Sequence, residues 1–396
     1  MNVRVALKRI GLVYALNALF KAAKMKRALA RLSVRYSSLC KGLEYKAEDI
    51  PDMVAERLKD RGIFQSPRER LRIFWIGANW EQDNSGFLQA LERFGEVSHF
   101  TNFNGKYGLE FSERKYDQAL VERNGNCLLE QITRVQETRG KIDLLLGQMW
   151  ANYLSVEALK RIQDMGIATA NISMDDRLPE LWEVHNGVLL GSIGLAKGLD
   201  LVLTSSPECC IRYAYHGCPA IFWPMASDPK LFKPAEEKDL DVSFVGNNYG
   251  TRGTIVRMLQ SEGIRIETYG AGWPNGPVGP REAAKIFGRS KIILGIGTIG
   301  YCSDLYTLKL RDFDATMAGA LYITHRNPDL LNLFVEGEEI ECYSTNDEAL
   351  EKIKYYRGHP EQRERIGRAA AAKARKLHTW EGRIETALHE VGLVAM

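Results

Sequence analysis

The chain has 396 residues, of which 45% are hydrophobic and 26% charged, so it is long enough to bury the cores of two or three domains. Its 53 basic and 50 acidic residues give a formal net charge of +3, and this balance argues against nucleic-acid binding by the chain as a whole. No apolar run approaches the ~20 residues that span a bilayer, and no signal-peptide pattern opens the chain, so we expect a cytoplasmic protein.

The seven cysteines are odd in number and scattered along the chain. They lack the C-x-x-C spacing of zinc and redox sites. Cys209, Cys210, His216 and Cys218 are close in sequence, but their spacing matches no familiar metal site. We therefore expect small buried thiols in a reducing compartment, with no bound metal and no cofactor.

The first 41 residues form the most asymmetrically charged segment. No acidic residue precedes Glu44, whereas basic residues recur throughout. Leu12, Leu16, Leu19 and Phe20, with Tyr14 nearby, follow one another at roughly helical spacing. The pattern predicts a basic helical extension over residues 1–65, and two interpretations stay open. The helix lies on an anionic membrane, such as the inner face of the cell membrane, or it is solvated or packs on its own domain.

From residue 71 onward, short apolar strands alternate with helices. The predicted strands are residues 71–76, 97–100, 142–146, 168–172, 199–204 and 220–223. The predicted helices are residues 87–94, 156–164 and 207–215. This alternation is typical of a mostly parallel, doubly wound sheet and predicts a first α/β domain over residues 66–226.

A proline-bearing linker over residues 224–234 leads to a second series of the same kind. Its predicted strands are residues 242–245, 265–269, 291–294, 320–324 and 340–343. They define a second domain over residues 227–377, and residues 378–396 are expected to form a helix that packs back on the first domain. Two Rossmann-like domains of this kind face a central cleft at the carboxyl ends of their strands, and several enzyme and binding-protein classes share that architecture.

The glycine motifs narrow the class of ligand. No G-x-G-x-x-G follows the first strand, where residues 77–80 read GANW, and no Walker phosphate loop occurs, which disfavours nicotinamide and ATP sites. In the second domain, a strand runs into a loop that contains Gly246 and ends at Arg252, just before a helix. Such a loop can hold an anion, because glycine lets the backbone approach a phosphate and a guanidinium matches its oxygens.

Residues 307–324, TLKLRDFDATMAGALYIT, resemble the donor-site signature of CgeB-like glycosyltransferases, which are similar to the retaining GT-B enzymes. The similarity continues through residues 327–330, 334–340, 353–356 and 378–383, and more weakly through 224–234 and 244–253. The resemblance implies a GT-B fold and the transfer of a sugar, of hexose type, from a nucleotide-sugar donor.

In the wider GT-B group, two glutamates eight positions apart contact the donor. Asp314 falls at the second position, which holds the nucleotide ribose, and a carboxylate suits a diol because it accepts two hydrogen bonds. Tyr306 occupies the first position, which holds sugar hydroxyls, so this contact departs from the family pattern.

Arg252 falls where the group places a lysine that binds the pyrophosphate. Asn247 stands where many members have a second basic residue, and Lys309 or Arg311 is expected to compensate. Such cations stabilise the charge that grows on the departing nucleotide without a metal. The alternative for Arg311 is a structural ion pair with a neighbouring aspartate of the same helix.

Acceptor residues are expected in the first domain. Asp175 and Asp176 follow the strand over residues 168–172, where a carboxylate can accept the proton of the acceptor hydroxyl or stabilise charge on the sugar ring. A helix cap is the alternative for either aspartate. Asn79 and Asp83, after the first strand, are the candidate acceptor contacts.

Together these observations predict a retaining, metal-independent glycosyltransferase with a nucleotide-sugar donor and a glycan, lipid-linked or protein acceptor. Two alternatives stay open. One is a nucleotide-sugar epimerase on the same fold, and the other is a noncatalytic GT-B scaffold attached to a membrane or a partner by its basic helix.

Overall fold

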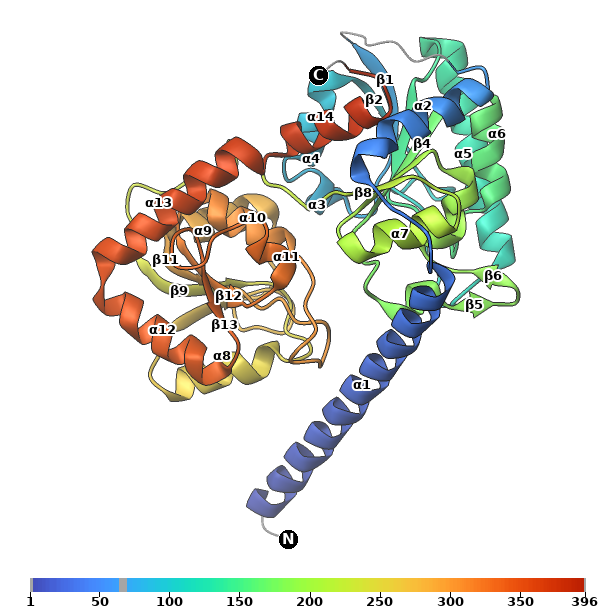
Figure 1. The fold of residues 1–396 in the computed structure, drawn as a ribbon. Coiled ribbons are helices and arrows are strands. Elements are labelled where there is room, and N and C mark those ends of the chain that lie inside the picture. Colours follow the sequence, from blue (N-terminus) through green and yellow to red (C-terminus); the bar gives the residue numbers. More distant parts are fainter. Residues whose placement is uncertain (1–2, 64–69, 395–396) are drawn as a thin grey trace. The chain divides into compact units, whose positions relative to one another are not determined.

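A computed structural model of the chain describes residues 3–63 and 70–394, with side chains described from residue 16 onward. The side chains of Leu12 and Tyr14, two members of the predicted amphipathic pattern, lie outside the described residues. The chain divides into two units (Figure 1). The N-terminal unit comprises Leu32–Met225 and Trp380–Met396, and the C-terminal unit comprises Met1–Arg31 and Ala226–Thr379.

The N-terminal unit is built on a six-stranded sheet in which all neighbouring strands are parallel. In spatial order the strands are β2 (Gly95–His99), β1 (Leu71–Ile76), β3 (Leu144–Gly147), β4 (Ala168–Ser173), β7 (Leu201–Thr204) and β8 (Ala220–Phe222). Apolar runs such as LRIFWI in β1 are buried at nearly every position, as expected for parallel strands that helices cover on both faces. The predicted parallel α/β architecture is confirmed, and strand ends differ from prediction by one or two residues.

Two groups of helices pack around this sheet. The first group contributes Leu129, Ile162 and Tyr213 to one apolar core and consists of α5 (Gln118–Arg139), α6 (Val156–Asp164) and α7 (Pro207–Tyr215). In the second group, α14 (Trp380–Glu390) contacts both α2 (Ile50–Asp60) and α4 (Phe87–Phe94). The short elements are α3 (Trp80–Asp83) and the 3-10 turns Ala47–Asp49, Pro179–Trp182 and Ser192–Gly198.

A small antiparallel hairpin interrupts the α/β pattern of this unit. It pairs β5 (Val184–His185) with β6 (Val188–Leu189) across Asn186 and Gly187, whose φ angles are 50° and 82°. Two consecutive positive φ angles are what a type I′ turn needs, and Asn-Gly is the preferred dipeptide for it.

The C-terminal unit repeats the doubly wound design with five parallel strands, which Figure 1 shows side by side with helices around them. In spatial order they are β10 (Ile266–Tyr269), β9 (Leu240–Val245), β11 (Ser290–Leu294), β12 (Leu321–His325) and β13 (Glu341–Tyr343). Helices α8 (Arg252–Ser261) and α12 (Asn346–Gly358) share one apolar core with this sheet. The remaining helices are α9 (Pro280–Arg289), α10 (Leu310–Met317), α11 (Pro328–Leu331) and α13 (Pro360–Leu377).

Helix α1 (Val3–Leu39) is divided between the two units, and the predicted extension over residues 1–65 stays a prediction. Its residues up to Arg31 group with the C-terminal unit, where Lys26 Nζ lies 2.7 Å from a carboxylate oxygen of Asp304. From Leu32 onward the helix belongs to the N-terminal unit, and Tyr36 is buried there with its hydroxyl 2.8 Å from His216 Nε2. The alternation of apolar residues in α1 therefore serves packing along part of its length.

Helix α14 completes the N-terminal unit although it comes from the end of the chain. The Trp380 ring lies 5.4 Å from Phe87 and 5.9 Å from Trp223, measured between ring centroids. Trp223 Nε1 donates to the carbonyl of Arg383 at 2.7 Å. Aromatic packing and one buried hydrogen bond thus fix the helix on α4 and on the strand that ends before Trp223.

The cysteines all carry free thiols, and six of the seven are buried. Burial raises the pKa of Cys218 to about 12, so its thiol stays protonated and unreactive. Among residues 3–63 and 70–394, no three His, Cys, Asp or Glu side chains lie together so as to hold a metal ion. In the same described ranges, no helix has both the length and the apolar character that crossing a bilayer requires.

Replacing Trp380 with alanine should destabilise the N-terminal unit by about 3 to 5 kcal/mol, because the change removes a buried aromatic side chain and leaves a cavity. The matched control is Trp80→Ala, since Trp80 is 50% exposed and should cost far less. Denaturant unfolding followed by circular dichroism measures both variants. Equal losses would contradict the role assigned to α14.

Candidate functional site

The loop between β9 and α8 closes tightly on the carboxyl end of the C-terminal sheet. Gly246 begins it with a φ of 148°, and a Cβ atom there would lie 2.3 Å from Arg311 Nη2. Trp273 Nε1 donates to the Gly246 carbonyl at 2.7 Å and holds the loop from the far side. Only glycine leaves room for the guanidinium at this position, so the predicted loop residue has a specific steric reason.

Two arginines meet beside this loop. Arg252 is the first residue of α8 and donates from Nη1 to the Asn247 carbonyl at 2.9 Å. Arg311, in the first turn of α10, donates from Nε to the Val245 carbonyl at 2.6 Å. They are 5% and 8% exposed, and both guanidinium groups lie over the Phe244 ring, at 5.7 and 4.5 Å from its centroid.

Neither arginine forms an ion pair with a carboxylate within the described ranges, although the charge of Arg311 is near enough to oppose the rise in the pKa of Asp312 and Asp314. Burial lowers the pKa of Arg252 to about 10, and repulsion by Arg311 adds to the effect. Nη1 of Arg311 is buried and has no hydrogen-bond partner in the described part of the chain. Two adjacent buried guanidinium groups with an unused donor form a site for an anion with several oxygens, such as a diphosphate.

The structural alternative for Arg311 is not what the structure shows. Within the described ranges, no ion pair joins Arg311 to Asp312 or Asp314. Asp312 instead accepts a hydrogen bond from the backbone N–H of Lys309 at 2.7 Å and so caps the start of α10. Arg311 is instead directed toward the end of β9, where Nε donates to the Val245 carbonyl.

Asp314 lies one turn further along α10 and is 7% exposed. Its Oδ1 accepts a hydrogen bond from Ser227 Oγ at 2.7 Å. Burial raises the pKa of Asp314 well above its usual range, although the bond from Ser227 and the charge of Arg311 oppose the shift. The predicted ribose contact thus lies one turn from Arg311 on the same helix, but most of its surface is covered by protein.

A small cavity of about 200 Å³ lies at the same edge of the sheet. Thr251 and Thr298 line it, with their hydroxyl oxygens 2.7 Å apart, and so does His325 at the end of β12. Tyr306 lies against His325 with the ring centroids 5.3 Å apart, and its hydroxyl donates to the Ser303 carbonyl at 3.0 Å. The Tyr306 side chain is therefore held by an aromatic contact to a histidine and by a hydrogen bond to the backbone.

His325 was missed by sequence reasoning. Its Nδ1 accepts a hydrogen bond from the Gly297 N–H at 3.2 Å, and burial lowers its pKa to about 4. The imidazole is therefore neutral at physiological pH. The signal that could have found it is its position directly after the predicted strand 320–324, because ligands of parallel sheets bind at carboxyl ends of strands.

In the N-terminal unit, Asn79 and Asp83 lie after β1 but have structural partners. Asn79 caps α3 by accepting from the Gln82 N–H at 3.1 Å. Asp83 is 2% exposed and accepts from the hydroxyl of Tyr107 at 2.8 Å and from the side-chain amide of Gln148 at 3.0 Å. Burial raises the pKa of Asp83, whose carboxyl group belongs to this internal hydrogen-bond network. Asn79 is the more accessible of the two residues.

Asp175 and Asp176 differ sharply in environment. Asp176 is 2% exposed, and its carboxylate accepts hydrogen bonds from Ser173 at 2.6 Å, Thr204 at 2.6 Å and Tyr213 at 3.0 Å. It joins three elements and is not a helix cap. Asp175 is exposed at the end of β4. Of the two aspartates, Asp175 is the one that presents its side chain to solvent at the carboxyl edge of this sheet.

With this geometry established, comparison with known proteins defines the fold. Residues 229–389 match the sequence model of a family described as glycosyl transferase-like. Sucrose-phosphate synthase from Thermosynechococcus elongatus superposes with a TM-score of 0.55 at 12% identity, over 81% of this chain and 98% of that enzyme. The chain has the GT-B glycosyltransferase fold.

Further solved structures share the GT-B fold of this chain. HepE from Anabaena, solved with UDP, gives a TM-score of 0.55 at 11% identity, over 81% of this chain and 100% of HepE. A glycosyltransferase from Rickettsia africae gives the same TM-score at 9% identity, over 81% of this chain and 98% of that protein. No curated protein sequence matches the chain.

The family match covers most of the unit that carries the arginine pair and continues into α14. It begins at Pro229 and includes the loop at Gly246, both arginines and Asp314, and it ends within α14. The glycosyl transferase-like assignment from the sequence is therefore confirmed at this level, and membership of the CgeB-like group stays a prediction.

Protonation of His325 should lower the free energy of unfolding of the chain in mild acid. Its folded pKa of about 4 is below the ~6.5 of an unfolded histidine, so the unfolded state takes up a proton first as pH falls. Between pH 8 and pH 5 this linkage should remove about 2 kcal/mol of stability. Between these two pH values, the free energy of unfolding of His325→Phe, measured with urea, should fall by about 2 kcal/mol less than that of wild type. Equal decreases in both proteins would contradict the lowered pKa of His325.

Proposed function

We propose that the protein is a glycosyltransferase whose C-terminal unit binds the diphosphate of a nucleotide-sugar donor between Arg252 and Arg311. The observation that carries this proposal is the pair of buried guanidinium groups beside a glycine loop, with Nη1 of Arg311 lacking a partner among the described residues. A buried pair of cations that has no ion-pair partner within the described ranges is costly unless a ligand supplies more counter-charge.

The same pair suits the chemistry of sugar transfer. When the glycosidic bond to the nucleotide breaks, negative charge grows on the leaving phosphate, and fixed guanidinium groups stabilise it more in the transition state than in the ground state. We propose that this fixed charge allows transfer without a metal. Retention of the anomeric configuration is proposed from the resemblance of residues 307–324 to retaining enzymes.

The donor is proposed to be a UDP-sugar with a hexosyl group. HepE, which shares the fold, was solved with UDP, with UDP-glucose, and with UDP and glucose. Asp314 is assigned to the ribose: Ser227 orients Oδ1, and Oδ2 makes no hydrogen bond with the described residues. Lys309 and Tyr306 are further donor candidates, with Tyr306 placed where the family has an acid that holds the sugar.

The acceptor is assigned to the N-terminal unit, with Asp175 as the catalytic carboxylate. Asp175 is favoured over Asp176 because a general base has to reach its substrate, and the carboxylate of Asp176 is covered by three hydroxyl groups. Asn79 is the preferred acceptor contact, since Asp83 is buried. The acceptor is a glycan, a lipid-linked molecule or a protein, and side chains other than these select among them.

Arg252→Ala should weaken UDP binding by about 10- to 100-fold, the usual effect of losing hydrogen bonds to a charged group. Calorimetric titration of the full chain with UDP, GDP and ADP, in the presence of EDTA, measures the affinity and tests metal independence together. The matched control is Arg265→Ala, because Arg265 belongs to the same unit and its side chain is 84% exposed.

Normal UDP affinity in a folded Arg252→Ala protein would refute the donor-site assignment. No binding of any nucleotide by the wild type would favour a noncatalytic scaffold. Product analysis with UDP-glucose distinguishes the remaining alternative, because an epimerase converts the donor without an acceptor.

A second proposal concerns α1, which we infer attaches the protein to an anionic membrane surface. One face of the helix is exposed and mostly apolar and consists of Leu16, Leu19, Phe20, Ala23, Ala30 and Val34, with Arg27 among them. The exposed basic residues beside this face are Lys21, Lys24, Lys26, Arg31 and Arg35. The opposite face is less exposed and carries the packing residues Leu32 and Tyr36. Packing therefore accounts for one face only, and an apolar stripe flanked by cations suits a layer of acidic lipid headgroups.

Phe20→Glu should reduce binding to vesicles that contain phosphatidylglycerol by about tenfold or more, since burial of one Phe is worth about 1.5 to 3 kcal/mol. Phe103→Glu is the matched control, because Phe103 is 71% exposed but lies in the N-terminal unit, and Phe20 is 69% exposed. Co-sedimentation measures both. Point changes are preferred to removal of the helix, which would also delete buried Leu32 and Tyr36. Unchanged binding by Phe20→Glu would refute the membrane proposal.

A further inference from the structure

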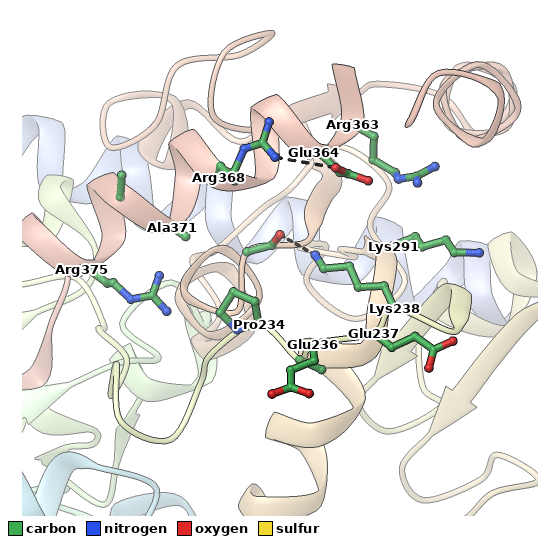
Figure 2. Close-up of a pocket in the computed structure, with 13 residues that line it drawn as sticks. Pro234, Glu236, Glu237, Lys238, Lys291, Arg363, Glu364, Arg368, Ala371 and Arg375 are labelled. Atoms are coloured by element: carbon green, nitrogen blue, oxygen red, sulfur yellow. Dashed lines mark hydrogen bonds and ion pairs between the residues drawn. The ribbon is translucent and has the colours of Figure 1, made fainter. Parts of the chain in front are cut away.

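A second, larger cavity lies in the C-terminal unit, at the edge of the sheet opposite the loop at Gly246. Its volume is about 600 Å³, within the range of small-molecule sites. Figure 2 shows the cavity between the segment that leads into β9 and one face of α13. Three lining residues stand at the starts of strands: Lys238 is two residues before β9, Lys291 is the second residue of β11, and Gly319 is two residues before β12. The amino-terminal ends of these strands therefore form the floor of the cavity.

Basic side chains outnumber acidic ones around this cavity. The basic ones are Lys238, Lys291, Arg363, Arg368 and Arg375, and the acidic ones are Glu236, Glu237 and Glu364. Lys291 is paired with Asp241 at 2.7 Å, and Arg368 is within 3.7 Å of Glu364. Arg375 has neither a hydrogen bond nor an ion pair with the described residues, so positive charge is left over on the face of α13.

Lys238 is the residue that points to a ligand. Its Nζ donates to the Gly319 carbonyl at 2.6 Å, and a protonated amine has further N–H donors that no described residue accepts. Burial lowers the pKa of Lys238 to about 8. Arg363 and Arg368 lower it further, and Glu364 alone opposes them. An incoming anion would restore the favourable charge balance around this half-buried amine.

We propose that this cavity binds a small phosphate-bearing molecule at a site separate from the one at Gly246. Lys238 would hold a phosphate at the floor. Arg368 and Arg375 are seven residues apart on α13, which places them about 10 Å apart along one helix face, so they can contact a second anionic group of the same ligand. Glu236 and Glu237 on the rim can accept hydrogen bonds from hydroxyl groups of its organic part.

The site is tested by calorimetric titration of the full chain with inorganic pyrophosphate. Because Arg252 and Arg311 are also expected to bind this probe, wild type should show two classes of site. The double variant Arg368→Ala with Arg375→Ala should weaken one class by about tenfold or more and keep the other. The matched control is Arg365→Ala with Lys376→Ala, which removes the same charge from exposed positions of α13 that do not line the cavity.

A site-specific readout accompanies the titration. Acetylation of Lys238 by acetic anhydride, followed by mass spectrometry, should slow when pyrophosphate is present, both in wild type and in Arg252→Ala. Protection in Arg252→Ala makes the result independent of the donor site. The proposal would be overturned if the titration gave a single class of site that the double variant does not weaken, or if the control pair weakened pyrophosphate binding equally. It would also be overturned if pyrophosphate left the rate of Lys238 acetylation unchanged.

Discussion

Two buried arginines tie the C-terminal unit together at the carboxyl end of β9. Arg311 donates to Val245 and Arg252 donates to Asn247, so two helices that start at opposite sides of the loop are fixed to the same backbone segment. Both guanidinium groups also lie over Phe244, whose ring belongs to the core beneath them. The fold thus fixes the positions of two positive charges whatever ligand is present. Preorganised charge of this kind needs no rearrangement during a reaction, and enzymes rely on it to stabilise developing negative charge.

Much of the fold could be predicted because parallel strands buried on both faces appear as short apolar runs between turn residues. Residues 71–76 and 168–172 are examples in which prediction and structure nearly coincide. Helix α5 was missed because buried Asn124 and Gly125 interrupt its apolar pattern. The Asn186-Gly187 dipeptide carried a clear hairpin signal, but the strands on each side have two residues each, too few to show a period.

The site residues show where reasoning from sequence stops. Arg252 and Gly246 could be found because a glycine loop before a helix has a local signature. The partner of Arg311 could not, since it is a backbone carbonyl 66 positions away rather than a nearby carboxylate. Asp176 looked like a catalytic or capping residue, but Ser173, Thr204 and Tyr213 converge on it from separate elements. Whether an acid faces solvent or the interior depends on such distant contacts, which spacing alone does not encode.

The chain leaves the N-terminal unit after Met225 and returns to it at Trp380. During synthesis, the strands of that unit therefore emerge from the ribosome long before the helix that covers Phe87 and Trp223. Until α14 has been made, this apolar surface lacks its native cover, and exposed apolar surface of this kind favours aggregation. The C-terminal sheet has no such delay, because its strands and α13 are contiguous in the chain. The N-terminal sheet can thus form first, but the core of the second domain can be complete before the core of the first.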